Sequence, residues 1–109
     1  MSFQVFLTDG AAGDLEDIYN YAAKHDAPGK ADRLLDHLEK VFAGLSQSPN
    51  RRGTFPKELL ALGIREYREV FFKPYRIVYR IVEEAVYVLL IIDGRRDMQA
   101  LLQRRLLET

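Results

Sequence analysis

The spacing of apolar residues changes once within the first half of the chain, from a strand-like to a helix-like period. Residues 2–8 alternate between apolar and polar side chains, which predicts a short strand with Phe3, Val5 and Leu7 on one side. Residues 11–46 then repeat apolar positions every three or four residues, which predicts two amphipathic helices over about 11–24 and 28–45. Asp9 is the expected N-cap of the first helix. Because the break at Pro28-Gly29 is short, the two helices are expected to form an antiparallel hairpin.

The second half of the chain reads mainly as strands. A loop is expected over 47–63, and a β-meander over 64–93, built from the runs 64–72, 75–82 and 85–93. A C-terminal helix is expected over 97–107, with Asp97 as its cap. The order β-α-α-β-β-β-α predicts a single domain over 1–109 of the α+β class. A helical hairpin would pack on a twisted, mainly antiparallel four-stranded sheet, followed by the C-terminal helix.

Composition excludes several classes of protein. Apolar residues make up 48% of the 109-residue chain, which fits a packed globule. The chain has no cysteine, so disulfides and thiolate-bound metal are excluded. The start MSFQVFLTDG lacks the features of a secretory signal, and the longest apolar run, 85–92, is too short to span a bilayer. We therefore expect a cytoplasmic protein without membrane contact.

The charges are distributed unevenly although their sum is zero. Residues 1–50 hold four Lys/Arg and eight Asp/Glu (4 − 8 = −4), whereas residues 51–109 hold twelve and eight (12 − 8 = +4). The neutral sum argues against strong non-specific binding of nucleic acid. The basic second half can still form a local patch for an anionic ligand, and a solvated surface of mixed charge is the alternative.

The segment YRIVYRIV, residues 75–82, places two arginines inside a predicted strand. Because side chains alternate between the faces of a strand, Arg76 and Arg80 share one face, opposite the core-like face with Tyr75, Ile77, Tyr79 and Ile81. These guanidiniums either face a groove that receives an anionic group or are neutralised by carboxylates of the sheet, with Glu66, Glu69 and Glu84 as the candidates.

Further arginines lie close to the ends of the predicted strands. Arg68 is on the strand before YRIVYRIV, and Arg95 and Arg96 follow the last strand. In a meander, Arg68, Arg76 and Arg96 are expected to converge on one concave region. Such a group would bind phosphate, as in RNA cleavage, or the carboxylates of an acidic partner.

The sequence offers no other recognisable catalytic or cofactor site. The two histidines, His25 and His37, have no metal-ligand spacing around them and are interpreted as surface residues. No GxSxG, Walker or GxGxxG motif occurs. We expect neither a metal nor a cofactor.

The residues IREYREVFFKPYRIVYRIVEEAVYVLLIIDGRRDMQALLQRR, together with the preceding helical hairpin, resemble the RelE/ParE superfamily of toxins from type II toxin–antitoxin systems. The resemblance is densest at Tyr75–Tyr79 and at the strand exit Asp93–Asp97. It spans nearly the whole chain and implies the same order of elements.

The resemblance implies one of two activities. RelE-like members cleave messenger RNA on the ribosome, and ParE-like members poison DNA gyrase without the nuclease residues. If the chain is a nuclease, Arg68, Arg76 and Arg96 are the candidate catalytic residues. Leu102, however, lies where the family pattern has a tyrosine or histidine acid/base. Because arginine is a poor proton donor, such a site would catalyse weakly, which favours the ParE-like activity.

We therefore expect a toxin that inhibits growth by poisoning DNA gyrase. A co-encoded antitoxin is expected to hold it inactive in a hetero-oligomer. The resemblance and the charge pattern name five antitoxin-binding residues: Arg68, Arg76, Arg80, Arg95 and Arg96. A ribosome-dependent nuclease acting on messenger RNA, and a toxin-fold protein without toxicity, are the alternatives.

Overall fold

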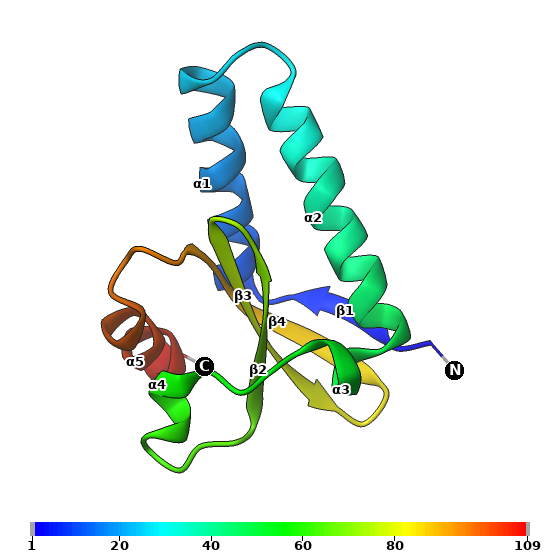
Figure 1. Cartoon of the computed structure of the whole chain (residues 1–109), viewed down its shortest axis with the longest axis vertical. Helices are drawn as coiled ribbons and strands as arrows, with labels where there is room; N and C mark the ends of the chain where they lie inside the picture. Colours follow the sequence, from blue (N-terminus) through cyan, green and yellow to red (C-terminus); the bar gives the residue numbers. More distant parts are fainter. Residues whose placement is uncertain (1, 109) are drawn as a thin grey trace.

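The computed structural model describes residues 2–108 as five helices and four strands in one α+β layer structure (Figure 1). The strands are β1 (Gln4–Leu7), β2 (Tyr67–Phe72), β3 (Tyr75–Val82) and β4 (Ala85–Asp93). The helices are α1 (Asp9–His25), α2 (Lys30–Gln47), α3 (Pro49–Arg52), α4 (Lys57–Leu60) and α5 (Met98–Glu108). The expected fold class is confirmed.

The sheet has the strand order β1-β4-β3-β2. The meander β2-β3-β4 is antiparallel, and β1 joins β4 in parallel at the opposite edge. The pairing of β3 with β4 shifts between Val78 and Tyr79, where Leu89 is the extra residue of a β-bulge. The bulge reverses the alternation of β4, so Leu89 and Leu90 both pack on the same side of the sheet.

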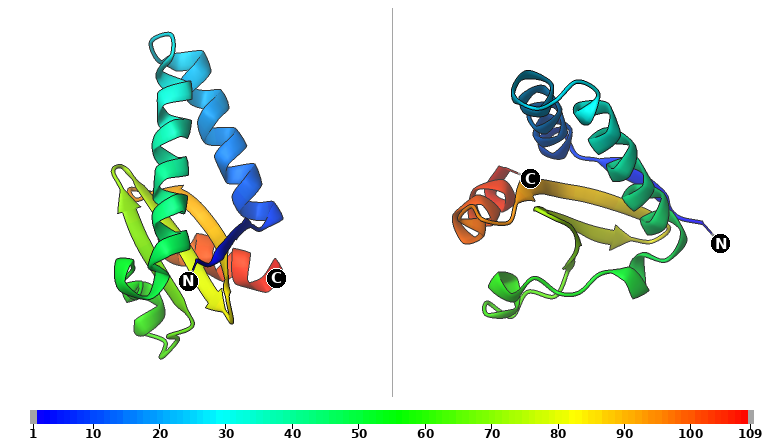
Figure 2. Two further views of the ribbon diagram at one scale, coloured as in Figure 1. Left: turned by 90° about the vertical axis from the view of Figure 1, so that its right-hand side faces the viewer. Right: turned by 45° about the horizontal axis from the view of Figure 1, so that its top comes forward.

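The helical hairpin of α1 and α2 covers one face of the sheet. Figure 2 shows the hairpin on one side of the sheet and α4 on the other. The hairpin buries Ala11, Leu38 and Leu45 against a sheet face that carries Ile77, Tyr79, Val86, Val88 and Ile91. Ile77 and Tyr79 belong to the predicted core face of YRIVYRIV, and Ile81 of the same face packs against this cluster while partly buried.

The opposite face of the sheet is covered only in part. Met98 and Leu102 of α5 and Leu59 of α4 pack there against Tyr67, Val78, Leu90 and Ile92. Arg76 and Arg80 share this face, as the alternation of the strand predicted. The remaining part of the face lies beyond the reach of α4 and α5 and carries the candidate site described below.

The starts of the first two helices differ from the expected ones, whereas Asp97 caps α5 as predicted, by accepting a hydrogen bond from the N–H of Ala100. Thr8, not Asp9, caps α1: its side chain accepts a hydrogen bond from the N–H of Ala11, and its hydroxyl donates to the carbonyl of Val88. Residue 9 is already helical, so its carboxylate acts on the helix dipole instead. The second helix begins at Lys30 instead of residue 28, because Gly29 takes a left-handed conformation with φ 83°.

The expected loop over 47–63 contains two short helices, and the second strand starts at Tyr67 instead of residue 64. Pro49 begins α3, where its missing N–H is not needed. Thr54 forms a bridge to the edge of β2 at Glu69, with N···O distances of 3.0 and 2.7 Å. Ile64 instead ends the α4 turn by donating to the carbonyl of Leu59, which keeps it out of the strand.

Within residues 2–108, no helix combines the length and the apolar composition that crossing a bilayer requires.

Candidate functional site

The sheet face opposite the hairpin has an apolar part that neither α4 nor α5 covers. Its centre is formed by Phe6, Val82 and Tyr87, which are 43%, 36% and 38% exposed. The rings of Phe6 and Tyr87 stack with their centroids 5.4 Å apart, so β1 and β4 present one aromatic surface. We call Phe6, Arg80, Val82 and Tyr87 the uncovered face.

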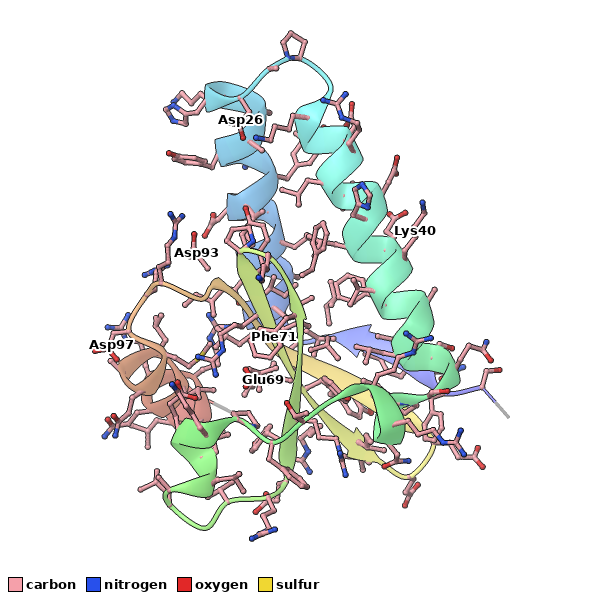
Figure 3. The ribbon with its side chains drawn as sticks, in the orientation of Figure 1. Asp26, Lys40, Glu69, Phe71, Asp93 and Asp97 are labelled. Atoms are coloured by element: carbon pink, nitrogen blue, oxygen red, sulfur yellow. The ribbon has the colours of Figure 1, made fainter. Side chains whose placement is uncertain are left out.

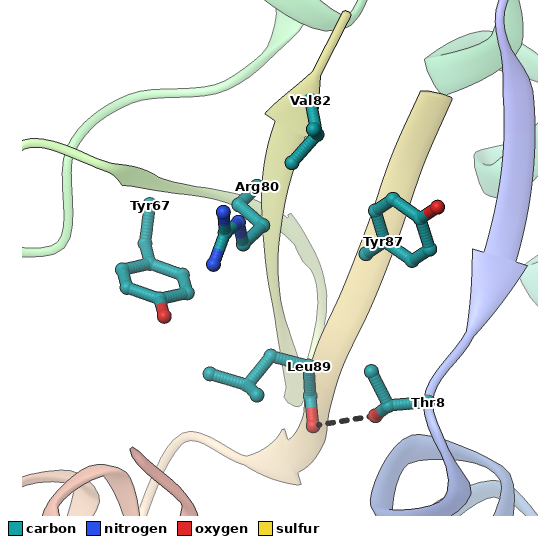
Figure 4. A pocket seen from close by; sticks show the side chains of 6 residues that line it. All are labelled: Thr8, Tyr67, Arg80, Val82, Tyr87 and Leu89. Carbon is teal, nitrogen blue, oxygen red and sulfur yellow. Dashed lines mark hydrogen bonds between the residues drawn. The ribbon is translucent and has the colours of Figure 1, made fainter. Parts of the chain in front are cut away.

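A shallow cavity of about 260 Å³ lies on the uncovered face (Figure 4). Its wall includes Tyr67 from β2, Leu89 from the bulge of β4 and Thr8, the N-cap of α1. The Thr8 hydroxyl is held by the carbonyls of Val88 and Leu89, at 3.0 and 3.4 Å. The strands β2, β3 and β4 therefore contribute to this cavity, together with Thr8 at the start of α1, so its shape depends on how these elements are placed.

Arg80 places a positive charge in these apolar surroundings. Its guanidinium lies 6.0 Å from the ring of Tyr67, and Figure 4 shows it between Tyr67 and β3. No carboxylate among the described residues forms an ion pair with Arg80. An apolar surface with one uncompensated guanidinium suits a partner that brings both apolar side chains and a carboxylate.

Arg76 lies on the same face but is enclosed by acidic side chains. Its Nε donates to Glu69 at 2.7 Å, and its Nη1 and Nη2 donate to the two oxygens of Glu58 at 2.9 and 2.8 Å. The hydrogen bonds to Glu58, supported by those to Glu69, raise the pKa of the Arg76 guanidinium. Arg76 is therefore neutralised by carboxylates of the protein itself, which was one of the two alternatives for this residue. Glu69 was among the expected partners, and Glu58 was not.

Arg68 lies on the opposite face of the sheet from Arg76. It pairs directly with Tyr79, which belongs to the core beneath the hairpin, and pairs across a sheet point to the same side. Its Nη1 donates to the carbonyl of Gly53 at 3.2 Å, and its guanidinium lies 4.6 Å from the ring of Phe55. Arg68 thus supports the segment that runs along the edge of β2.

Arg95 and Arg96 lie in the turn between β4 and α5. Arg95 binds the carboxylate of Asp93 at 2.9 and 2.6 Å, and these hydrogen bonds lower the pKa of Asp93 to about 2. Both arginines border a cavity of about 450 Å³ that also includes Tyr21 of α1 and Tyr75 of β3. This cavity belongs to the hairpin side of the molecule.

The expected convergence of Arg68, Arg76 and Arg96 in one concave region is therefore wrong. In the register of β2 with β3, Arg68 is opposite Tyr79 and Arg76 is opposite Phe71, and these two pairs point to opposite faces of the sheet. Arg96 lies beyond the end of β4, where the chain turns toward α5.

Neither histidine lies on the sheet face that carries Arg76 and Arg80, so no histidine can transfer a proton there. The rings of His25 and Tyr21 lie with centroids 4.4 Å apart in a tilted arrangement, and His37 stacks on Phe72 at 5.4 Å, so both histidines belong to the hairpin. Leu102 is 1% exposed inside the core under α5. Among residues 2–108, no group of three or more His, Asp or Glu side chains is placed to hold a metal ion.

Two residues of the uncovered face were not predicted. Phe6 interrupts the alternation of Phe3, Val5 and Leu7, and this apolar residue on the polar side of a strand was the available signal. Tyr87 lies within the continuous apolar run 85–92, and a run without polar residues does not indicate which side chains point to which face of the sheet.

Comparison with known proteins identifies the family. The family model described as "ParE toxin of type II toxin-antitoxin system, parDE" matches residues 5–98. Toxin ParE3 of Caulobacter vibrioides (strain ATCC 19089 / CIP 103742 / CB 15) is 30% identical over 102 residues, which cover 94% of this chain and 97% of the relative. The chain belongs to the ParE toxin family of type II toxin–antitoxin systems, and the predicted superfamily is confirmed.

Two solved structures share the fold. A chain of the chromosomal ParDE toxin–antitoxin system from P. aeruginosa superimposes with a TM-score of 0.70 at 21% identity, covering 84% of this chain and 96% of that chain. A chain of the toxin–antitoxin complex RelBE2 from Mycobacterium tuberculosis gives a TM-score of 0.62 at 22% identity, covering 85% and 99%. Both superpositions agree with the α+β layers described above.

Proposed function

We propose that this ParE-family toxin inhibits growth by binding DNA gyrase, without chemistry of its own, and that a cognate antitoxin neutralises it. The observation that carries the proposal is the state of Arg76. A nuclease site built around this arginine would need its guanidinium free for phosphate, yet the side chain is only 11% exposed and is bound to both Glu58 and Glu69. A toxin that acts through protein contacts has no such requirement.

The uncovered face supports a binding function of this kind. It combines Phe6, Val82 and Tyr87 with the uncompensated Arg80, and neither histidine nor carboxylate borders its cavity. General acid–base catalysis contributes about 10²–10⁴-fold to rates, and this cavity lacks the side chains that most often supply it. Recognition, in contrast, needs only apolar area and a placed charge.

We further propose that the antitoxin is the natural occupant of the uncovered face. The matched family is one half of a toxin–antitoxin pair, and the structural neighbours come from a ParDE system and a RelBE2 complex. An acidic, amphipathic antitoxin segment would cover the aromatic surface and place a carboxylate on Arg80, giving a hetero-oligomer in the cytoplasm.

The five proposed antitoxin-binding arginines differ in how accessible their guanidinium groups are to an antitoxin carboxylate. Arg80 is available without rearrangement. An antitoxin carboxylate at Arg76 or Arg95 would have to compete with Glu58 and Glu69 or with Asp93. Contacts at Arg68 and Arg96 would belong to other surfaces of the toxin, so an antitoxin that uses all five must wrap around it.

The decisive experiment follows two targets of the purified toxin in parallel. We expect excess toxin to inhibit supercoiling by purified gyrase and to increase DNA cleavage complexes, and antitoxin to reverse both effects. Messenger RNA on programmed ribosomes should remain intact. Unaffected supercoiling would contradict the gyrase proposal. Transcript cleavage that is lost in a folded Arg96→Ala variant would establish the nuclease instead.

Expression of the folded toxin without antitoxin tests the remaining alternative. We expect growth arrest with induction of the DNA-damage response. Harmless expression of soluble, folded protein would contradict toxicity and leave a toxin-fold binding protein.

A further inference from the structure

The outer edge of β1 is open along two residues. The N–H of Gln4 bonds to the carbonyl of Glu84 at 3.1 Å, so Gln4 directs its backbone toward β4. Residues of a strand alternate in this respect, and the N–H and C=O groups of Val5 and Leu7 therefore point away from the sheet. None of the hydrogen bonds formed among residues 2–108 uses these outward groups, which leaves them for a partner.

The chain itself closes both ends of this open stretch. Phe3 donates its N–H to the carbonyl of Ser46 at 2.7 Å, and its own carbonyl accepts a hydrogen bond of 2.6 Å from the Ser46 hydroxyl. At the other end α1 begins at Asp9, so the chain leaves the sheet there. The edge therefore admits a partner strand only over Val5 and Leu7, and a longer strand would meet Ser46.

The strand β1 lacks the features that keep an exposed edge strand from pairing. Residues 2–8 contain no Lys, Arg, Asp, Glu or Pro, and the register of β1 with β4 is regular. The other edge strand, β2, is bridged at Glu69 by Thr54, with N···O distances of 3.0 and 2.7 Å; Figure 3 shows Glu69 beside β2. The uncharged edge of β1 matches an equally uncharged strand, and β1 of a second copy of this chain is such a strand.

An antiparallel pair of β1 strands about a two-fold axis at Phe6 uses the open stretch completely. Val5 of one copy then lies opposite Leu7 of the other, and each of the two equivalent pairs exchanges two backbone hydrogen bonds. Opposite Phe3 the second copy has already entered α1, so the contact with Ser46 is kept. A two-fold axis at Val5 would instead place Leu7 opposite Phe3, whose backbone groups are occupied. The backbone therefore selects the axis at Phe6.

The side chains on both faces of β1 are compatible with this axis. Phe6 is exposed and stacks on Tyr87, and at the axis the two Phe6 residues form a close pair with Cα atoms about 4.5 Å apart. On the hairpin side, a hollow of about 500 Å³ lies along the edge between Val5 and Phe42. Leu7 of the second copy, opposite Val5, enters this hollow. Apolar side chains therefore meet apolar side chains on both faces.

We propose that two copies of this toxin associate through the outer edges of β1, about a two-fold axis at Phe6, and so join their sheets into one. The pairs of Val5 with Leu7 supply the backbone hydrogen bonds, and the two Phe6 rings form the centre of the contact. Because two short strands bury little area, the association is weak, with a dissociation constant of about 10 µM. It is separate from the proposed target and from the antitoxin, since it needs neither.

Two measurements on the purified wild-type toxin test the association. In sedimentation equilibrium, the apparent mass is expected to rise from one copy to two between about 1 and 100 µM. Over the same range, amide hydrogen exchange of Val5 and Leu7 should slow about fivefold, because solvent-facing amides become hydrogen-bonded. A toxin that remains a single copy at about 100 µM would overturn the proposal. So would association without slower exchange at these two residues, or slower exchange that requires antitoxin.

A matched pair of variants tests the position of the axis. Phe6→Glu places two carboxylates directly opposite each other and is expected to weaken association at least about tenfold. Tyr87→Glu is the control, since it changes the other exposed aromatic residue of the same stack. Its two carboxylates would lie three strand spacings apart, roughly 14 Å, where salt screens their repulsion. Equal weakening by both variants would contradict the axis at Phe6, and the wild-type exchange measurement needs no variant to fold.

Discussion

Arg76 of β3 and Glu58 of α4 form a two-pronged ion pair, with N···O distances of 2.9 and 2.8 Å and side chains that are 11% and 16% exposed. This pair fastens the short helix α4 to the sheet, because Arg76 also binds Glu69 on β2. The arginine that the family pattern suggested as a phosphate ligand is a structural residue in this molecule.

Arg76→Ala is expected to destabilise the protein by about 3–5 kcal/mol, because two carboxylates would remain largely buried without their cation. Arg33→Ala, at an exposed position of α2, is the control and should change stability by less than about 0.5 kcal/mol. Denaturant unfolding followed by circular dichroism measures both. An Arg76→Ala protein as stable as the wild type would contradict the structural role.

Acid should release the same contact. The hydrogen bonds from Arg76 lower the pKa of Glu58 below its ordinary value of 4.5. A group whose pKa is lower in the folded state stabilises that state above the ordinary pKa and loses this contribution as the pH falls through the folded value. We expect the unfolding midpoint to decrease below about pH 4.5. Glu58→Gln should flatten that decrease, and an unchanged slope would contradict the assignment to Glu58.

Gly53→Ala is expected to destabilise the protein by about 1–3 kcal/mol through overpacking. A Cβ at this position would overlap the Tyr79 hydroxyl and lie 2.8 Å from its Cζ. Tyr79 cannot move aside, because it is fully buried and donates a 2.6 Å hydrogen bond to the carbonyl of Pro49. Thermal unfolding measures the effect.

Gly13→Ala is the matched control for that substitution. Gly13 lies within α1, and nothing lies within 4 Å of its Cβ position. Alanine there should stabilise the protein by about 0.5–1 kcal/mol, since glycine costs a helix that amount. Equal effects of the two alanines would show that the packing at Gly53 is not the cause.

The contact between Arg105 and Asp14 fixes the C-terminal helix. The Nη1 and Nη2 of Arg105 donate to Asp14 at 2.9 Å each, and Nη1 also donates to the carbonyl of Leu89. Asp14→Ala should increase amide exchange across α5 and destabilise the protein by about 1–3 kcal/mol, because the mostly buried Arg105 guanidinium loses its two charge-assisted hydrogen bonds to the Asp14 carboxylate. Asp17→Ala on the same helix is the control. Unchanged exchange in α5 would contradict this role.

Arg80→Glu is expected to weaken antitoxin binding about 10- to 100-fold, because it replaces an attraction by a repulsion on the uncovered face. Arg33→Glu changes the charge equally at an exposed position on the hairpin and should have little effect. Titration calorimetry at two salt concentrations measures both. Equal affinities would move the antitoxin away from the uncovered face.

Much of the fold followed from periodicity. The alternation in YRIVYRIV predicted that Arg76 and Arg80 share a face, and the tight connections at 73–74 and 83–84 predicted the meander. The bulge at Leu89 was not predictable, because all residues of the run 85–92 are apolar and a break in the alternation of faces leaves no trace in such a run. The short helices α3 and α4 were missed because each has four residues, too few for a periodic signal.

The amino-acid sequence by itself determined the order of the longer helices and strands, the family and the positions of the arginines along the chain, since these depend on local spacing and residue type. Only the tertiary structure decided which arginines are available. Arg76 meets Glu58 from 18 residues away, Arg68 faces the hairpin, and Arg80 remains without a carboxylate. A guanidinium's role depends on which carboxylates reach it, and that depends on strand register and on where α4 docks, neither of which local sequence encodes.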